Sequence, residues 1–334
     1  MLEHGGKLRL AAQRYGIPLE QWMDLSTGIN PNGWQGELPP MSTWARLPED
    51  EDGLVAAAMA YYDVENLLPV AGSQAAIQTL PKLRTQSRVA VLSPSYNEHA
   101  HAWQCAGHDV ELVTFEQLHQ VVERVDVLVL VNPNNPTGAT FDQATLLQWH
   151  QTLAQRQGWL IVDEAFMDST PDKSLAKETN QEGLIVLRSI GKFFGLAGAR
   201  VGFVLAQNKL LAALQEALGP WTVSGPSRWL ATQALKDFQW QSDMMQQLKQ
   251  QSQRLNLLLQ QNNLIPSGDT TLFQTITAPY AAYVHEQLAQ QGVLTRLFID
   301  ASLIRFGLPK DEVQWQKLAQ VLAALQLNQE VLSA

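Results

Sequence analysis

The stretch from Ser189 to Arg200 carries the clearest chemistry in this chain, because its single lysine, Lys192, lies among small and apolar neighbours. An amine in such surroundings is desolvated, which disfavours its ammonium form and leaves the amine available to attack a carbonyl. Ser189 and Arg200 suit another task, since a hydroxyl and a fixed guanidinium together bind phosphate. A cofactor that has both a carbonyl and a phosphate, and that joins an enzyme lysine, is pyridoxal 5′-phosphate. A bare Ser-x-x-Lys indicates only a surface turn, but the Gly-Leu-Ala-Gly-Ala-Arg continuation favours the cofactor site.

Two further polar residues stand upstream, each after an apolar run. Asn135 lies in Asn-Pro-Asn-Asn-Pro-Thr-Gly, and Asp163 opens Asp-Glu-Ala-Phe. Taken singly, Asn135 could fix a turn and Asp163 could cap the segment that follows it. Turn chemistry does not explain why both precede Lys192 and Arg200 in one strand–helix pattern. The combination therefore favours a functional site.

A repeated alternation of strand and helix must position these residues. We expect strands at 88–93, 125–131, 159–162 and 184–187, an antiparallel strand at 201–205, and helices at 53–62, 75–83, 142–156 and 207–218. The run 125–131 is almost continuously apolar, which is typical of a strand buried on both faces. Polar residues at the strand ends indicate an α/β fold with a mostly parallel sheet and a site at the carboxyl ends of its strands.

Two more features belong to the same predicted edge of the sheet. Gly72, Ser73 and Gln74 precede the helix 75–83, and a helix N-terminus offers free N–H groups and a positive dipole end to an anion. Tyr96 follows the strand 88–93 and could stack on a flat cofactor ring, although an isolated aromatic side chain more often packs in a core.

The chain changes character after about residue 207. We expect a long helix over 227–262, then strands at 271–276, 293–298 and 303–306, and helices at 281–291 and 311–325. The pattern predicts an N-terminal arm over 1–45 with a short helix at 8–15, a large α/β domain over 46–215, and a smaller α+β domain over 216–334 that packs with the arm. Arg296 and Arg305 lie near strand ends of the smaller domain.

Composition limits the partners. The 334 residues have a net charge of −9, so a nucleic-acid partner is not expected and an anionic substrate must be held by a local cluster of arginines. The one cysteine, Cys105, suits a reducing cytoplasm. We see no signal peptide and no apolar run long enough to span a membrane, and we predict no metal site.

The motifs together resemble those of the fold-type I pyridoxal-phosphate enzymes, the class I and II aminotransferase superfamily. This resemblance implies a large domain with a mostly parallel sheet and a smaller α+β domain. It implies that Lys192 binds the cofactor covalently, that Asp163 pairs with the pyridine nitrogen, and that Asn135 donates to the ring 3′-oxygen. It further implies a phosphate site made by Gly72, Ser73, Gln74, Ser189 and Arg200, stacking of Tyr96 on the ring, and a substrate carboxylate held by Arg305.

Two positions depart from the superfamily pattern. The tyrosine that often stands three residues after the aspartate, and donates to the 3′-oxygen, is Phe166 here. A Tyr-Pro pair is also common where this chain has Leu47-Pro48, so the contact that this tyrosine usually makes to the neighbouring subunit's cofactor is in doubt.

Within the superfamily, the chain resembles two branches that act on phosphorylated substrates, the histidinol-phosphate aminotransferases and the threonine-phosphate decarboxylases of cobalamin biosynthesis. His-Gly-Gly near the N-terminus, Leu-Ser-Thr-Gly-Ile-Asn-Pro, and Arg-Phe-Gly-Leu-Pro favour the second. The resemblance then implies decarboxylation of L-threonine O-3-phosphate, with His4, Lys7, Asn30 and Arg296 as candidates for the phosphate grip or the adjoining site. A solvated terminus is an equal alternative for His4 and Lys7. A turn is the alternative for Asn30, and a structural ion pair is the alternative for Arg296.

The resemblance also implies a homodimer with the cofactor near the subunit interface. A non-enzyme alternative is a sensing or scaffold protein of the same fold. It is disfavoured because Lys192 and Asp163 are both present, and because no helix-turn-helix motif or basic segment precedes the predicted large domain.

Overall fold

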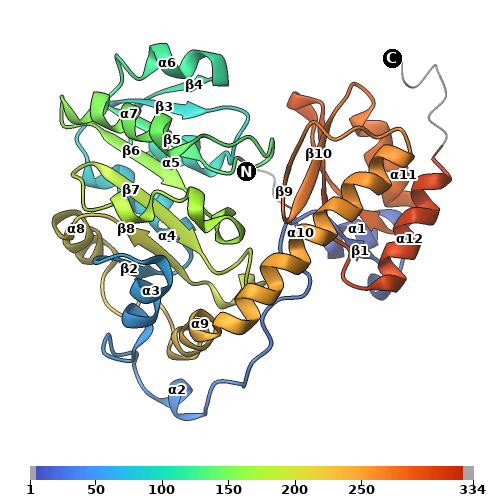
Figure 1. Cartoon of the computed structure of the whole chain (residues 1–334), viewed down its shortest axis with the longest axis horizontal. Coiled ribbons are helices and arrows are strands. Elements are labelled where there is room, and N and C mark those ends of the chain that lie inside the picture. The colour runs from blue at the N-terminus through green and yellow to red at the C-terminus, as the bar shows by residue number, and fades with distance from the viewer. Residues whose placement is uncertain (1–4, 326–334) are drawn as a thin grey trace. The chain divides into compact units, whose positions relative to one another are not determined.

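The computed structural model describes residues 5–325. Its strands are β1 (Met23–Asp24), β2 (Leu68–Val70), β3 (Arg88–Leu92), β4 (Asp109–Val113), β5 (Val127–Val131), β6 (Trp159–Asp163), β7 (Leu184–Ser189), β8 (Gly202–Leu205), β9 (Gly268–Thr270), β10 (Phe273–Thr277), β11 (Val293–Leu294), β12 (Arg296–Phe298) and β13 (Leu303–Gly307). Its α-helices are α1 (Leu8–Tyr15), α2 (Ser42–Ala45), α3 (Leu54–Tyr62), α4 (Ser73–Thr79), α5 (Glu98–Cys105), α6 (Leu118–Val121), α7 (Gln143–Ala154), α8 (Asn208–Leu218), α9 (Gly225–Lys236), α10 (Phe238–Gln261), α11 (Ala281–Gln290) and α12 (Glu312–Ala323) (Figure 1).

The chain divides into two compact units. One comprises Met1–Asn32, Pro136–Gly138 and Asp243–Ala334, and the other comprises Gly33–Asn135 and Ala139–Ser242. The larger unit therefore ends at Ser242, whereas the expected boundary between the large and the small domain was at residue 215. The physical reason is that α9 packs on α2 and α3, with no room at Gly225 for a side chain beside the backbone of Thr43.

The larger unit is built on a seven-stranded sheet with the order β2-β8-β7-β6-β5-β3-β4. The pairs from β4 through β3, β5 and β6 to β7 are parallel, while β8 is antiparallel to both β7 and β2. All five residues of β5 are buried, as expected for the apolar run. This mixed, mostly parallel sheet confirms the predicted α/β fold.

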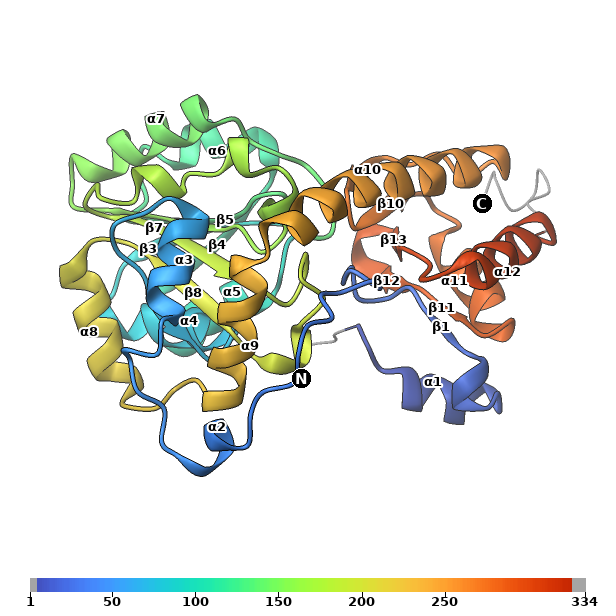
Figure 2. The ribbon, with the colours of Figure 1, turned by 60° about the horizontal axis from the view of Figure 1, so that its bottom comes forward.

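Helices cover both faces of this sheet (Figure 2). On one face, apolar residues of α4, α5 and α8 pack with alternate residues of the strands, including Ile161 of β6 and Leu187 of β7. Helix α7 lies on the other side and packs against β6. Because side chains alternate along a strand, residues 161, 163, 185, 187 and 189 share the α4–α5 face, and 162, 164, 186 and 188 share the α7 face.

The smaller unit holds a four-stranded antiparallel sheet with the order β12-β13-β10-β9. In the register of the first pair, Arg296 of β12 lies directly opposite Arg305 of β13. The N-terminal segment adds β1, which pairs parallel with β11. The predicted strand 293–298 is therefore two short strands that pair with different partners.

The predicted helix 227–262 is interrupted at Asp237, which has the non-helical backbone angles φ −87° and ψ 71°. Its side chain accepts one hydrogen bond from the backbone N–H of Trp240, at 3.1 Å, and another from the Trp34 indole, at 2.9 Å. Asp237 thus caps the start of α10 and ends α9, an outcome that depends on a tryptophan distant in sequence.

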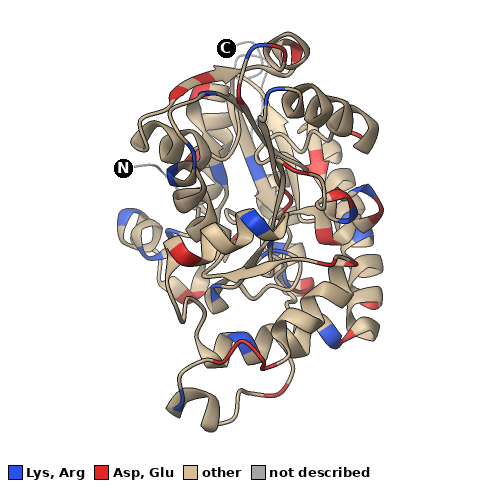
Figure 3. Ribbon diagram, turned by 90° about the vertical axis from the view of Figure 1, so that its left-hand side faces the viewer, with Lys and Arg blue, Asp and Glu red and all other residues tan. Residues whose placement is uncertain are grey.

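No helix within residues 5–325 is both long and apolar enough to cross a membrane. Acidic and basic residues are interspersed along the ribbon in the view of Figure 3, which fits the modest charged fraction of 16%.

Gly202, at the start of β8, provides a test of this packing. A Cβ atom there would lie 2.6 Å from the backbone nitrogen of Ser73 and 2.8 Å from the carbonyl oxygen of Arg188. Gly202→Ala should therefore destabilise the protein by roughly 1–3 kcal/mol in chemical denaturation, as overpacking does. Gly198→Ala is the matched control, because a Cβ there meets no atom within 4 Å. Equal unfolding midpoints for the two variants would contradict the close approach.

Candidate active site

The residues expected to do chemistry in the larger unit all lie at one edge of its sheet. Strands β3, β5, β6 and β7 are parallel, and β2 runs in the same direction because it is antiparallel to β8. Their carboxyl ends therefore meet at one edge, where the segments that carry Tyr96, Asn135, Asp163 and Lys192 leave the sheet. Arg200 precedes β8, whose opposite direction brings its first residues to this edge too.

Asp163 is the last residue of β6 and is 3% exposed. One carboxylate oxygen, Oδ2, is 2.9 Å from Nε2 of His99, and Oδ1 accepts a hydrogen bond of 3.0 Å from the backbone N–H of Ala165. These contacts replace the water that the buried carboxylate has lost. Each oxygen retains a second lone pair, so Asp163 can still accept a hydrogen bond from a ring N–H.

His99 was not among the residues predicted from the sequence. It lies on α5, which begins just after the end of β3, and its side chain is 2% exposed. The available signal was Tyr-Asn-Glu-His, because a helix that starts at a strand end turns its first residues toward the neighbouring strand ends. The aspartate in question lies 64 positions away, so only the fold shows the pairing.

A cradle for an anion forms where β2 meets α4. Gly72 has the left-handed angle φ 71°, and a Cβ atom there would lie 2.5 Å from a terminal nitrogen of Arg200. The guanidinium of Arg200 therefore lies over the turn, and the positive φ at position 72 favours glycine. Ser189 is close to the same strand end, where its hydroxyl oxygen accepts a hydrogen bond from the N–H of Gly191 at 3.2 Å. The N–H groups of Ser73 and Gln74 open α4, so this part of the site suits a phosphate group.

Tyr96 is held by a chain of hydrogen bonds. Its hydroxyl donates to Oε1 of Gln74 at 3.1 Å, and Nε2 of Gln74 donates to Oε2 of Glu98 at 2.8 Å. Burial, and secondarily the charges of Glu98 and Asp163, raise the pKa of Tyr96 to about 12. The phenol therefore stays protonated at neutral pH and its ring is fixed in place. Glu98 is a second contributor that sequence reasoning missed.

Lys192 lies beside Phe166, with the amine nitrogen Nζ 5.4 Å from the centre of the aromatic ring. Phe166 is buried and Lys192 is half-buried. The fold thus brings the segment after Asp163 next to the lysine, across neighbouring strands.

The loop that carries half-buried Asn135 is fixed by the two asparagines before it. Asn132 accepts a hydrogen bond of 3.0 Å from the N–H of Phe141. Asn134 donates to the carbonyl oxygen of Pro94 at 2.9 Å and accepts from the hydroxyl of Ser95 at 2.8 Å. These bonds join the loops after β3 and β5, so they help to place Tyr96 and Asn135.

In the smaller unit, Arg305 is 4% exposed and donates to the carbonyl oxygen of Ser26 at 2.7 Å. Burial, with a contribution from the charge of Arg296, lowers its pKa to about 9, so the guanidinium is still a cation at neutral pH. Both guanidiniums also lie over the ring of Phe298. Like charges directly opposite on neighbouring strands are unfavourable unless an anion joins them. The pair is therefore a candidate binding site for an anionic ligand, beside the charge of Asp24, which acts on Arg305 in the opposite direction to Arg296.

A cavity of about 470 Å³ in this unit is lined by Arg296 and by further polar and charged residues. These include Lys7, Arg14, Ser26, His285 and Thr295. Lys7 is exposed, and Asn30 is buried with its side-chain oxygen accepting from the N–H of Asn32 at 2.9 Å. His4 lies outside the described residues.

Comparison with known proteins now defines the class. The family model described as aminotransferase class I and II matches residues 22–309, and the chain belongs to this family. The predicted superfamily is thereby confirmed.

Two relatives match almost the whole chain. A threonine-phosphate decarboxylase of Pseudomonas aeruginosa is 55% identical over 324 residues, which cover 96% of this chain and 97% of the relative. A threonine-phosphate decarboxylase of Sinorhizobium is 39% identical and covers 97% of this chain and 98% of the relative. A histidinol-phosphate aminotransferase of Mannheimia succiniciproducens is 30% identical over 57% of this chain and 58% of its own length.

Solved structures agree in fold. A histidinol-phosphate aminotransferase of Sinorhizobium meliloti, in complex with pyridoxal-5′-phosphate, gives a TM-score of 0.83 at 20% identity, with 99% of this chain and 95% of that chain covered. An L-threonine-O-3-phosphate decarboxylase of Porphyromonas gingivalis gives a TM-score of 0.77 at 19% identity and covers 89% and 97%.

Proposed function

We propose that this chain is a pyridoxal-phosphate-dependent decarboxylase that converts L-threonine O-3-phosphate to (R)-1-amino-2-propanol O-2-phosphate in cobalamin biosynthesis. Two threonine-phosphate decarboxylases that match nearly end to end support this substrate. The structural observation that carries it is the opposed pair Arg296 and Arg305, because a substrate with both a carboxylate and a phosphate supplies two anionic groups.

The residues of the larger unit fit the cofactor. They provide a turn at Gly72 over which Arg200 lies, a buried carboxylate at Asp163 and an amine at Lys192, all at one edge of the sheet. When bound, pyridoxal phosphate withdraws electrons from the bond that breaks at the substrate α-carbon. Lys192 would hold the cofactor through its amine, and it is the nearest candidate to return a proton to the substrate α-carbon.

The other residues hold and orient the cofactor. Asp163 accepts the hydrogen bond of the pyridine nitrogen, and His99 keeps the carboxylate directed at it. Asn135 donates to the ring 3′-oxygen, Tyr96 stacks on the ring, and the phosphate is bound by Gly72, Ser73, Gln74, Ser189 and Arg200. Because Gln74 already links Tyr96 to Glu98, its side chain also orients the stacking ring, and its backbone N–H serves the phosphate.

The two anionic groups of the substrate need separate grips. Arg305 takes the carboxylate, since its buried guanidinium is fixed between Ser26 and two phenylalanine rings. Arg296, which lies opposite and lines the cavity, takes the phosphate, together with Asn30 and the N-terminal residues His4 and Lys7. In this arrangement the carboxylate and phosphate grips determine which bond at the α-carbon stands perpendicular to the ring.

The deciding assay measures CO₂ from L-threonine O-3-phosphate with pyridoxal phosphate and no keto acid. We expect stoichiometric CO₂ and an amine product that retains the phosphate. Threonine without its phosphate should react far less, because Arg296 and its neighbours then have no anion to bind. Turnover that instead requires 2-oxoglutarate and produces glutamate would establish the aminotransferase alternative.

Lys192→Ala should abolish the covalent adduct that borohydride traps between the protein and pyridoxal phosphate, and leave the unfolding temperature nearly unchanged. Lys209→Ala is the matched control, since Lys209 is an exposed lysine of α8 in the same unit. Mass spectrometry of the reduced protein locates the adduct. An adduct of normal yield on another lysine of the Lys192 variant would refute the assignment.

Phe166→Tyr should lower the spectroscopic pKa of the lysine-bound cofactor. A phenol at this position, next to Lys192, would donate to the 3′-oxygen and stabilise the deprotonated form, in which that oxygen bears more negative charge. The native protein, with phenylalanine, should therefore stay yellow to higher pH. Tyr96→Phe is the control, because the Tyr96 hydroxyl already donates to Gln74 and its loss should not lower this pKa. An unchanged or raised value for Phe166→Tyr would exclude residue 166 from the ring environment.

The same proposal includes a cytoplasmic homodimer. Four large apolar side chains are exposed within ten residues of one another: Leu38 (86%), Met41 (78%), Trp44 (64%) and Leu47 (64%). Trp221, 60% exposed, belongs to the same unit. Such a concentration of apolar surface is typical of an obligate interface between copies of one chain. Leu47 stands at the position of the missing cross-subunit tyrosine, so it would contribute apolar contact and no hydrogen bond.

Analytical ultracentrifugation should show a dimer at micromolar concentration. Met41→Asp combined with Trp44→Asp should shift the protein toward monomer, because charged groups are excluded from an apolar interface. Val313→Asp is the control, since Val313 is an apolar residue 75% exposed in the other unit. A fully active wild-type monomer would disprove this arrangement.

A further inference from the structure

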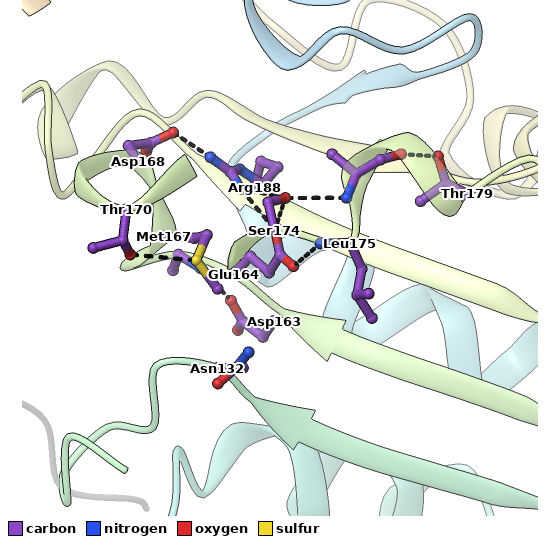
Figure 4. Close-up of polar contacts among 12 residues, drawn as sticks. Asn132, Asp163, Glu164, Met167, Asp168, Thr170, Ser174, Leu175, Thr179 and Arg188 are labelled. Carbon is purple, nitrogen blue, oxygen red and sulfur yellow. Dashed lines mark hydrogen bonds and ion pairs between the residues drawn. The ribbon is translucent and has the colours of Figure 1, made fainter. Parts of the chain in front are cut away.

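Arg188, one residue before Ser189, is enclosed in the interior of the larger unit with 1% exposure. Its Nη1 is 2.7 Å from Oε2 of Glu164, and its Nη2 donates to Oδ1 of Asp168. Figure 4 shows these three side chains converging with Ser174 at the ends of β6 and β7. The cluster lies on the α7 face of the sheet, whereas Asp163 and His99 lie on the α4–α5 face.

The cluster contacts both segments that carry the proposed chemistry. Glu164 immediately follows Asp163, and its backbone N–H donates to the carbonyl oxygen of Leu187 at 2.9 Å. Arg188 lies four residues before Lys192 on the neighbouring strand. The ion pair between Glu164 and Arg188 therefore links β6 and β7 one residue beyond their last register pair, Asp163 and Leu187.

Glu164 also anchors the loop segment 164–175, which contains Phe166. Its Oε1 accepts from the N–H of Leu175 at 2.8 Å, and the hydroxyl of Ser174 donates to Oε2. Both ends of the segment 164–175 are thus tied to one carboxylate, which Arg188 fixes in turn.

A second route leads from the cluster to the lysine segment. The hydroxyl of Tyr61 donates to Oδ1 of Asp168 at 3.4 Å, and its ring packs edge-on against Phe194, with 5.5 Å between the ring centres. Phe194 is the second residue after Lys192. Asp168 is therefore linked, through Arg188 and through Tyr61, to residues on both sides of the lysine.

Stability alone does not account for this cluster. Two carboxylates face one guanidinium, and burial raises the pKa of Glu164 and Asp168 even though Arg188 lies beside both. Oδ2 of Asp168 is buried without a hydrogen-bonding partner among the described residues. Incompletely satisfied buried ion networks are generally no more stable than apolar packing of the same volume.

We propose that Arg188 is a positioning residue, which acts through Glu164 and Asp168 to set the placement of Asp163 and Phe166 relative to Lys192. Its side chain lies on the α7 face of the sheet, away from the proposed cofactor residues Asp163 and Ser189. This inference rests on the proposed function for its effect on turnover, but the coupling between the two strand ends is a property of the protein alone.

The test uses a neutral triple variant, Arg188→Met with Glu164→Gln and Asp168→Asn, which removes all three charges together and leaves no unpaired buried ion. Arg188→Lys is the conservative variant, because it keeps one charge but cannot bridge two carboxylates in a fork. The matched control is Arg228→Met with Asp52→Asn. Arg228 is 4% exposed and 2.6 Å from Asp52 in the same unit, on helix α9 and the segment before α3.

Amide hydrogen exchange of the cofactor-free protein tests the coupling. In the triple variant, exchange should rise in peptides that cover 163–168 and also in those that cover 189–196, while the Arg228–Asp52 control changes neither. An increase confined to 163–176, or the same increase in the control, would overturn the proposal whether or not the protein is a decarboxylase.

Visible circular dichroism and spectroscopic pKa of the bound cofactor, with kcat and KM, test the consequence. The folded triple variant should show altered dichroism per unit absorbance and a shifted spectroscopic pKa. Its kcat should fall roughly 10- to 100-fold with a smaller change in KM, as expected for misplacement of about 1 Å. Arg188→Lys should have a kcat and a spectroscopic pKa between those of the wild type and those of the triple variant. If the folded triple variant has the dichroism, the spectroscopic pKa and the kcat of the wild type, Arg188 has only a structural role.

Discussion

A carboxylate buried at the end of a strand must receive hydrogen bonds in place of the water that it loses, and Asp163 imposes this requirement on the larger unit. Its partner His99 comes from α5, so the helix must begin close to the end of β3 and direct its first turn at β6. The same placement brings Tyr96 and Glu98 to the edge of the sheet. The hydrogen bond between Asp163 and His99 therefore helps to place α5 and the residues just before it on one side of the candidate site.

The alternation of side chains along a strand gives the ends of β6 and β7 two different environments. Asp163 and Ser189 face the helices α4 and α5, where the proposed cofactor residues gather. Glu164 and Arg188 face the opposite side and form a buried ionic cluster with Asp168 (Figure 4). Consecutive residues can thus serve binding on one face and support on the other. The parallel register of the two strands keeps both arrangements aligned.

Positive charge is used locally in this acidic chain, and each arginine has a distinct environment. Arg200 is exposed at the turn of Gly72, Arg188 is enclosed with two carboxylates, and Arg305 is buried opposite Arg296 with aromatic rings around it. The last pair brings two cations together on neighbouring strands. Like charges opposite each other on neighbouring strands are unfavourable, so an anionic group bound between them would be stabilising, which is consistent with the proposed substrate that carries a carboxylate and a phosphate.

The sequence by itself determined the α/β fold, the parallel sheet around the apolar run of β5, and the placement of Asn135, Asp163, Lys192 and Arg200 at strand ends. These features follow from local patterns, because hydrophobic periodicity, turn residues and short motifs are written in neighbouring positions. The tertiary structure decided the rest. It paired His99 with Asp163, joined Tyr96 to Glu98 through Gln74, enclosed Arg188 between Glu164 and Asp168, and broke the long helix at Asp237 through Trp34. Each of these contacts joins residues that only the order of strands and the packing of helices bring within hydrogen-bonding distance, so no local pattern could reveal them.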